Sequence, residues 1–272
     1  MGIKVAVGYD GSDPSRLALR WATEYAMAAQ AEVRIIHAWI WPLFTHDVAP
    51  VKGVADSGLR HAAEEILSDG LDLARAMSPG REIEPRMVTG LPVNVLRQEA
   101  LDADLLVVGN RGLGGFLGKL VGSVSVSLAG ACPCPLVVVR AERGKGKPVV
   151  ACIDGSLRSS NVLEQSVRVA QTLQTDLQIV HVDLSAPPRK HHIPSRAHGH
   201  DVLRNALLAV QDLAPDLVAR GQLLSGRSVA TALVEAGADA ELLVLGAPKR
   251  EGHPGTLATV LTHAHCNVMI AR

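Results

Sequence analysis

The chain has 272 residues, of which 47% are hydrophobic and 20% charged, as is typical of a soluble globular protein. Its 27 basic and 27 acidic residues cancel, which argues against the basic excess of a nucleic-acid-binding surface. No stretch approaches the roughly 18 apolar residues that a membrane helix needs, and the amino terminus does not resemble a signal peptide. We therefore expect a cytoplasmic protein with neither a nucleic-acid nor a membrane partner.

The first 140 residues alternate between strand and helix patterns. Continuous apolar runs that end in turn residues are typical of strands buried on both faces of a sheet. Such runs lie at 4–10, 32–39, 81–90, 104–110 and 135–141. Helical spacing of apolar residues lies between them, at 17–29, 57–77, 92–101 and 121–131. Ser12 and Pro14 supply a cap and an early proline for the first helix. This order predicts an α/β fold with a parallel sheet and helices on both faces.

The second half of the chain repeats the first. The segment KVAVGYDGS at 4–12 matches PVVACIDGS at 148–156, which aligns Asp10 with Asp154. Two later pairs of segments match as well, at 31–39 with 175–183 and at 131–140 with 263–272. We interpret this as two tandem doubly wound domains, residues 1–140 and 149–272, related by a pseudo-twofold axis. A charged, glycine-rich linker at 141–148 joins them.

A glycine-dense loop follows the predicted strand at 104–110. Its glycines lie at 109, 112, 114, 115, 118 and 122, and Ser123 follows directly. Since the next helix begins near Gly122, its first N–H groups and the positive end of its dipole would stabilise a phosphate in this loop. The alternative is a loop that needs glycines only to turn between strand and helix. The P-loop and dinucleotide fingerprints both fail, because Leu113 and Leu117 stand where these motifs need glycine.

The spacing G-x2-G-x9-G-[ST] that ends in Ser123, together with VAVGYDGS and CPLVVVR, resembles the ATP-binding branch of the universal stress protein family. The resemblance spans nearly the whole chain as a tandem pair of domains. It implies a five-stranded parallel sheet in the order 3-2-1-4-5 in each domain. It also implies an adenine nucleotide, ATP accompanied by Mg²⁺, as the ligand.

The resemblance implies positions for the nucleotide in the first domain. Gly8 and Asp10 would line the adenosine end, and Ala38 would place its backbone beside the adenine. Val108 and Gly109 would flank the ribose. The candidates for the phosphate end are Asn110, Arg111, Gly112, Gly122, Ser123, Val124 and Ser125, with Lys119 as a further cation. For Asp10, an Asx-turn or a helix cap before Pro14 stays open as the alternative.

The second copy departs from this pattern. Cys152 stands where the first copy has Gly8, and Lys249 where it has Gly112. The stretch from Gly246 to Gly255 spans nine residues, whereas Gly109 to Gly122 spans thirteen. We expect a weakened, altered or lost nucleotide site in this half.

The remaining signals point to structure more than to chemistry. His37 and His181 end buried strands, where a hydrogen-bonded structural histidine is the favoured interpretation. The histidines at 191, 192, 198 and 200 could bind zinc or nickel, but a solvated loop is the preferred interpretation. The four cysteines include no CxxC and are expected to be buried, reduced thiols. No catalytic motif can be read.

Three functions therefore stay open at the level of the sequence. The first is an ATP-binding regulatory protein of the stress response whose nucleotide state changes association or signalling. The second is a slow ATPase or another nucleotide-processing enzyme that uses the same pocket. The third is a nucleotide-free dimerisation scaffold. We expect either a homo-oligomer or pairing of the two domains within one chain.

Overall fold

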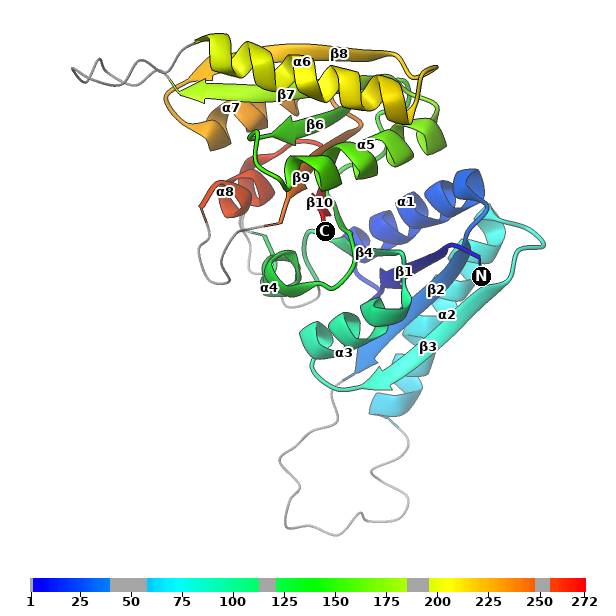
Figure 1. Cartoon of the computed structure of the whole chain (residues 1–272). Helices are drawn as coiled ribbons and strands as arrows, with labels where there is room; N and C mark the ends of the chain where they lie inside the picture. The colour runs from blue at the N-terminus through cyan, green and yellow to red at the C-terminus, as the bar shows by residue number, and fades with distance from the viewer. Residues whose placement is uncertain (1, 40–57, 113–120, 185–195, 248–254) are drawn as a thin grey trace. The chain divides into compact units, whose positions relative to one another are not determined.

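The computed structural model describes residues 2–39, 58–112, 121–184, 196–247 and 255–272. The chain divides into two compact units, Met1–Val139 and Arg140–Arg272. The pseudo-twofold relation between the two units stays a prediction. Figure 1 traces the chain from the amino-terminal unit to the carboxy-terminal one.

The first unit alternates strands and helices as the sequence predicts. Its strands are β1 (Lys4–Gly8), β2 (Glu32–Trp39), β3 (Ile83–Thr89), β4 (Leu105–Gly109) and β5 (Leu136–Val139). Its helices are α1 (Asp13–Ala29), α2 (Leu59–Met77), α3 (Pro92–Glu99) and α4 (Ser123–Ala131), with a 3-10 turn at Ala100–Asp102. The strands pair in parallel in the order β3-β2-β1-β4-β5, so the predicted order 3-2-1-4-5 is confirmed.

The second unit repeats this arrangement. Its strands are β6 (Val149–Ile153), β7 (Leu177–Leu184), β8 (Ala219–Gly226), β9 (Leu242–Gly246) and β10 (Asn267–Ala271). Its helices are α5 (Ser159–Leu173), α6 (Arg196–Leu213), α7 (Val229–Ala236) and α8 (Gly255–His263). The parallel order is β8-β7-β6-β9-β10, which is again 3-2-1-4-5 within the unit.

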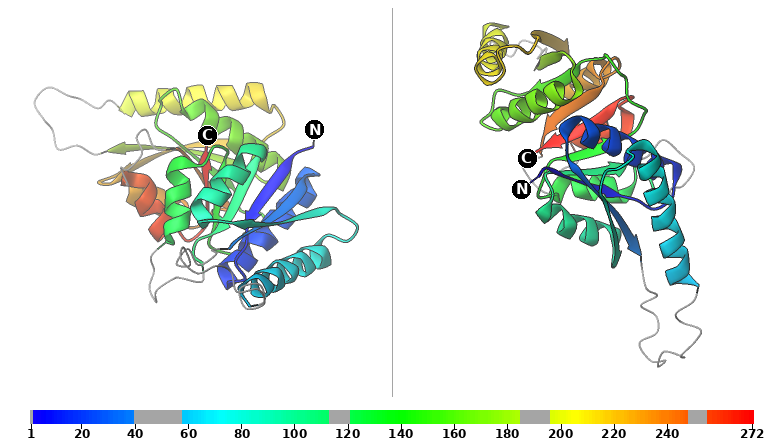
Figure 2. Two further views of the ribbon diagram at one scale, coloured as in Figure 1. Left: turned by 90° about the horizontal axis from the view of Figure 1, so that it is seen from below. Right: turned by 90° about the vertical axis from the view of Figure 1, so that its right-hand side faces the viewer.

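Helices cover both faces of each sheet (Figures 1 and 2). In the first unit α1 packs on β1 and β4, its neighbour α2 packs on β2 and β3, and α3 packs with α4. In the second unit α5 pairs with α6, and α7 pairs with α8. Strands that are covered on both faces bury every side chain, as β4 and β5 do along their whole length. The core of each unit therefore surrounds its own central strands.

Local signals in the sequence set the start of the first helix. Ser12 has an extended backbone and caps α1, and its Oγ accepts a hydrogen bond from the backbone N–H of Ser15 at 3.4 Å. Pro14 lies in the first turn, where its missing N–H costs nothing. Gly11 precedes the cap at φ 81°, a conformation that favours glycine. These residues fix the turn between β1 and α1, where the site lies.

Hydrogen bonds and an ion pair attach the start of the segment 141–148 to the rest of the second unit. The backbone N–H groups of Arg140 and Ala141 both donate to Oδ1 of Asn267, at 2.8 and 3.1 Å. The Arg140 guanidinium donates to the last carbonyl groups of α8, including that of Thr262 at 3.1 Å. Arg143 pairs with Glu241 at 2.6 Å. The segment is thus bound to the second unit along its first residues.

The state of the cysteines and the hydropathy of the helices bear on two further expectations. Cys132, Cys134 and Cys266 are buried and Cys152 is half-buried, and all four are free thiols. No helix in the described ranges combines the length and the hydropathy that crossing a membrane requires.

Candidate nucleotide site of the first unit

A cavity of about 520 Å³ lies at the carboxyl ends of β1, β2 and β4. The strand order reverses at this point, because β1 pairs with β2 on one side and β4 on the other. Doubly wound sheets bind ligands in such a crevice. The lining residues come from these strands, the two loops that follow β1 and β4, and α3 and α4: Gly8, Tyr9, Asp10, Ser15, Ile36, His37, Ala38, Pro92, Leu96, Val108, Gly109, Arg111, Gly112, Gly122, Ser123, Val124 and Ser125.

Asp10 lies in the turn that follows β1. Its Oδ1 accepts hydrogen bonds from the backbone N–H of Ser12 at 3.1 Å and from the Ser12 hydroxyl at 2.5 Å. This is the Asx-turn that the sequence leaves open as an alternative. The other carboxylate oxygen, Oδ2, points towards the backbone of Gly112 in the loop after β4. Asp10 is therefore both a turn residue and part of the cavity wall.

His37 fixes the same turn from the side of β2. Its Nδ1 lies 2.8 Å from the carbonyl oxygen of Tyr9, and because a carbonyl only accepts, Nδ1 carries the proton of this bond. The side chain is buried, as expected for a structural histidine. In the second unit, Nδ1 of His181 donates in the same way to the carbonyl of Ile153 at 2.9 Å. The interpretation of both histidines as hydrogen-bonded structural residues is confirmed.

The glycines of the loop after β4 permit close backbone approaches. A Cβ on Gly109 would lie 2.6 Å from the carbonyl oxygen of Pro14, a backbone atom that cannot move aside. A Cβ on Gly112 would lie 2.5 Å from Oδ2 of Asp10. Side chains at these positions would thus separate the two loops that form the mouth of the cavity.

Helix α4 begins at the edge of this cavity. Its cap residue is Gly122, which has no side chain to bind the first N–H groups, although the Gly122 N–H itself donates to the carbonyl of Asn110 at 2.8 Å. Ser123, Val124 and Ser125 form the first turn, and all three line the cavity. An uncapped first turn offers backbone donors and the positive end of the helix dipole to an anion.

The structure brings the predicted site residues together, with one exception. Asn110 does not line the cavity: its N–H donates to Val139 at 2.9 Å and its carbonyl accepts from Gly122. Ser125 lines the cavity but its hydroxyl donates to the carbonyl of Gly109 at 2.8 Å, which stabilises the loop. Ala38 lies near the carboxyl end of β2, within the predicted strand, and lines the cavity. Glycines 114, 115 and 118 and Lys119 lie outside the described residues.

Sequence reasoning missed the apolar wall of the cavity. Pro92 and Leu96 of α3 and Ile36 of β2 line it, although none was a candidate. Pro92 and Leu96 are four positions apart and so share one face of a helix, but this pattern is also that of any core-facing helix. No local signal could distinguish a ligand-facing apolar residue from a packed one.

Comparison with known proteins decides the family. The model described as the universal stress protein family matches residues 3–140 and, a second time, residues 146–272. The chain belongs to the universal stress protein family. Universal stress protein Rv2623 of Mycobacterium tuberculosis is 27% identical over 98% of this chain and 96% of its own length. Universal stress protein Rv1996 of the same organism is 28% identical over 92% of this chain and 87% of its own length.

A solved structure shows the same fold. The crystal structure of a universal stress protein from Archaeoglobus fulgidus superposes with a TM-score of 0.73, over 99% of this chain and 96% of that one. The two sequences are 18% identical, so this likeness concerns the fold alone.

The second universal stress domain builds the equivalent place differently. Asp154 keeps the Asx-turn, since its Oδ1 accepts from the Ser156 N–H at 2.9 Å. Cys152 adds a side chain where Gly8 leaves space. Arg158, at the position of Pro14, donates to the carbonyl of Ala247 just after β9 at 3.2 Å. Lys249, Pro248 and Pro254 lie outside the described residues.

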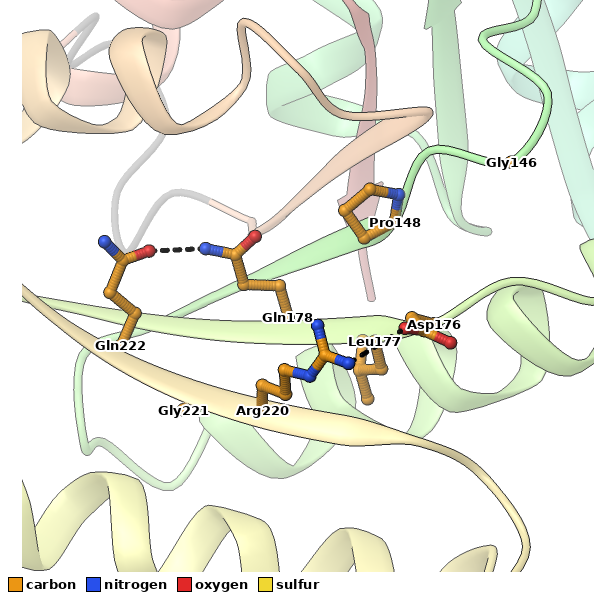
Figure 3. A pocket seen from close by; sticks show the side chains of 8 residues that line it. All are labelled: Gly146, Pro148, Asp176, Leu177, Gln178, Arg220, Gly221 and Gln222. Carbon is orange, nitrogen blue, oxygen red and sulfur yellow. Dashed lines mark hydrogen bonds and ion pairs between the residues drawn. The ribbon is translucent and has the colours of Figure 1, made fainter.

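A second hollow of about 400 Å³ lies elsewhere in the second domain, at the amino ends of β6, β7 and β8 (Figure 3). Its polar side chains bind one another: the Gln178 amide donates to Gln222, and Arg220 pairs with Asp176 at 3.9 Å. It lies at the opposite end of the strands from the crevice where doubly wound sheets bind ligands. The cavity of the first domain is therefore the better candidate site.

Proposed function

We propose that the first domain binds ATP, accompanied by Mg²⁺, and that the bound nucleotide regulates association or signalling in a stress response. The observation that carries this proposal is the uncapped start of α4, which opens onto the same cavity as an apolar wall and a carboxylate. An adenine ring needs a flat apolar slot, a ribose needs hydrogen-bond acceptors, and phosphates need backbone donors.

Each part of the nucleotide has a counterpart in the cavity wall. Ile36, Ala38 and Leu96 supply apolar surface for the adenine, and Asp10 supplies acceptor oxygens for a ribose hydroxyl or an exocyclic amine. The first turn of α4 and Arg111 would bind the phosphates. Mg²⁺ bound with ATP takes its ligands chiefly from phosphate oxygens and water. The volume of about 520 Å³ lies within the range of small-molecule sites.

We propose binding and not turnover as the function of the site. Among the described lining residues Asp10 is the acidic one, and its Oδ1 already accepts two hydrogen bonds from Ser12. Phosphoryl transfer to water needs a group that orients the nucleophile as well as charge stabilisation. The described lining offers the second of these in Arg111 and the start of α4.

The first test is direct. The purified chain is denatured, and any released nucleotide is identified and counted per chain; the stripped protein is then titrated with ATP and Mg²⁺ by calorimetry. We expect one tight site. Gly112→Ala should weaken it at least tenfold, because the new Cβ would lie 2.5 Å from Oδ2 of Asp10. Gly130→Ala in α4 is the matched control, since nothing lies within 4 Å of a Cβ there.

The effect of ATP on association is tested with the same purified protein. Size-exclusion chromatography with and without ATP should show a change of association state, or capture of a partner should depend on ATP. A wild-type chain that binds no adenine nucleotide would contradict the proposal and favour the nucleotide-free scaffold. Release of ADP at a steady rate that Asp10→Ala abolishes would favour the ATPase instead.

A further inference from the structure

A cluster of polar side chains lies behind the turn between β1 and α1. The Tyr9 hydroxyl donates to Oδ2 of Asp69 in α2. Nη2 of Arg16 in α1 lies 2.9 Å from the same oxygen. Nε of Arg16 donates to the carbonyl of Gly11 at 3.2 Å. Two helices and the turn are thus joined through one carboxylate.

The tyrosine of this cluster is deeply buried. Tyr9 is 2% exposed, and its ring lies directly over Gly70 of α2. A Cβ on Gly70 would be 2.8 Å from two ring carbons, so the ring fits because this residue is glycine. Burial and the hydrogen bond to Asp69 raise the pKa of Tyr9 above its ordinary value, which keeps the hydroxyl a proton donor.

The cluster and His37 hold the two neighbours of Asp10. Arg16 binds the carbonyl of Gly11 on one side, and His37 binds the carbonyl of Tyr9 on the other. Asp10 lies between these two anchors and lines the cavity. The position of its carboxylate therefore depends on the cluster as well as on the bonds from Ser12.

The second domain shows that the turn forms without the cluster. Gly11 at φ 81° corresponds to Gly155 at φ 77°. Gly11 faces Ile66 of α2, and Gly155 faces Val202 of α6, so the two β-branched residues correspond as well. From this alignment the counterparts of the four cluster residues follow. In the order Tyr9, Arg16, Asp69 and Gly70, they are Ile153, Ser160, Asn205 and Ala206. All four positions change together.

The joint change shows that the fold does not require the cluster. The second domain has the same sheet order, the same Asx-turn and the same histidine bond, yet has lost the hydroxyl, both charges and the glycine. Ile153 is smaller than its counterpart Tyr9, and Ala206 is larger than its counterpart Gly70. The two changes in volume therefore compensate each other. In the first domain, the turn that the cluster supports lines the cavity described above.

We propose that Asp69 and Arg16 are positioning residues for ligand binding, which hold Asp10 at the nucleoside end of the cavity through the turn. This inference rests on the proposed function. It predicts that loss of the cluster weakens the nucleoside end of the site, whereas the start of α4 is untouched.

The test uses Asp69→Asn in the full chain, because asparagine is the counterpart in the second domain. Calorimetric titration should show a roughly five- to tenfold loss of affinity for adenosine and an equal loss for ATP, the size expected for a weakened bond to a charged group. Asn205→Ala in α6 is the matched control and should change neither affinity. A residue that only supports the fold would lower the melting temperature but leave the affinity of the folded protein unchanged.

A double-mutant cycle decides between positioning and an independent effect. We expect Asp69→Asn to cost little in a chain that already carries Asp10→Ala, since the carboxylate to be positioned is then absent. Losses that simply multiply would overturn the assignment. If Asp69→Asn fails to fold, Arg16→Ser replaces it, because serine is the counterpart in the second domain and Arg16 does not line the cavity.

The possible failures are distinguishable. A wild-type chain that binds neither adenosine nor ATP overturns the proposed function and this assignment with it. A wild-type chain that binds both while Asp69→Asn binds them equally well overturns the assignment alone.

Discussion

The two domains share one fold, but they differ in the residues at the carboxyl ends of their strands. Both have the strand order 3-2-1-4-5, an Asx-turn after the first strand and a histidine bound to the backbone beside it. The first has Gly8 beside the side chains of Leu96 and Val108, and Gly112 beside the carboxylate of Asp10, where the second has Cys152 and Lys249 in the sequence. The fold therefore needs few of the residues that shape the cavity, and a copy that loses them keeps its sheet.

The glycine comparison makes this difference concrete. Gly109 would place a Cβ 2.6 Å from a backbone carbonyl, whereas among the described residues a Cβ on its counterpart Gly246 would meet Val162, at an ordinary 3.5 Å. The close approach of the loop after β4 to the start of α1 is thus specific to the first domain. In the second domain the Arg158 side chain lies at the corresponding place.

The largest effect on ATP affinity should come from Asp10, and its counterpart Asp154 should have little effect. We expect Asp10→Ala to weaken ATP binding about ten- to hundredfold, the range for loss of a hydrogen bond to a charged group. Asp154→Ala, the same change in the second domain, should leave tight binding intact. Calorimetry on both full-length variants measures this. Two equivalent ATP sites per chain, or a single site abolished by Asp154→Ala, would show that the sites are assigned to the wrong half.

A smaller effect should follow from transplanting the cysteine of the second domain. In Gly8→Cys the new Cβ would lie 3.0 Å from Leu96 and 3.3 Å from Val108, and its sulfur would add volume beside the cavity. Both neighbours are side chains that can shift, so we expect about a fivefold loss of affinity, near 1 kcal/mol. The reverse change, Cys152→Gly, is the control and should create no second site, because the loop after β9 stays four residues shorter. Gain of a second tight site would contradict this.

The smallest effect concerns a charge network that the second domain lacks. Arg34 on β2 pairs with Glu84 at 2.7 Å and Asp102 at 3.3 Å, whereas its counterpart is Gln178. Because the partners Glu84 and Asp102 are exposed, Arg34→Gln should lower the free energy of unfolding of the first domain by less than about 1 kcal/mol at pH 7. All three tryptophans, at 21, 39 and 41, lie in this domain, so urea unfolding followed by tryptophan fluorescence reports on it.

The same variant should show a defined pH dependence. The hydrogen bond and charge of Lys4, with the charge of Arg34, hold the pKa of Asp102 below its ordinary value. A lowered pKa in the folded state stabilises the protein above the unfolded-state pKa, and that stabilisation is lost as the pH falls through the folded-state value. Wild type and Arg34→Gln should therefore converge in stability below about pH 4, which is near the ordinary pKa of an aspartate. A difference that grows on acidification would exclude this network as its cause.

Local patterns in the sequence predicted the elements and their repetition. The Ser12 cap, Pro14 and the start of α4 at Gly122 and Ser123 are local signals, readable because a cap acts within one helical turn. The apolar runs predicted strands buried on both faces, and their alternation with helices predicted a parallel sheet. The family resemblance then gave the strand order, and those of its candidate residues that the structure describes, Asn110 apart, line one cavity.

The packing of the elements in three dimensions brings together the distant residues that form the site and the cluster behind it. Leu96 faces the cavity because α3 crosses that end of the sheet, and Asp69 reaches Tyr9 from 60 residues away because α2 packs on α1. Such contacts depend on strand register and helix packing, which many side chains set jointly. A hydrophobic or acidic residue looks the same in the sequence whether it meets a ligand, a neighbour or water. The physical reason is that local patterns specify which face of an element is buried, while the fold as a whole specifies what that face meets.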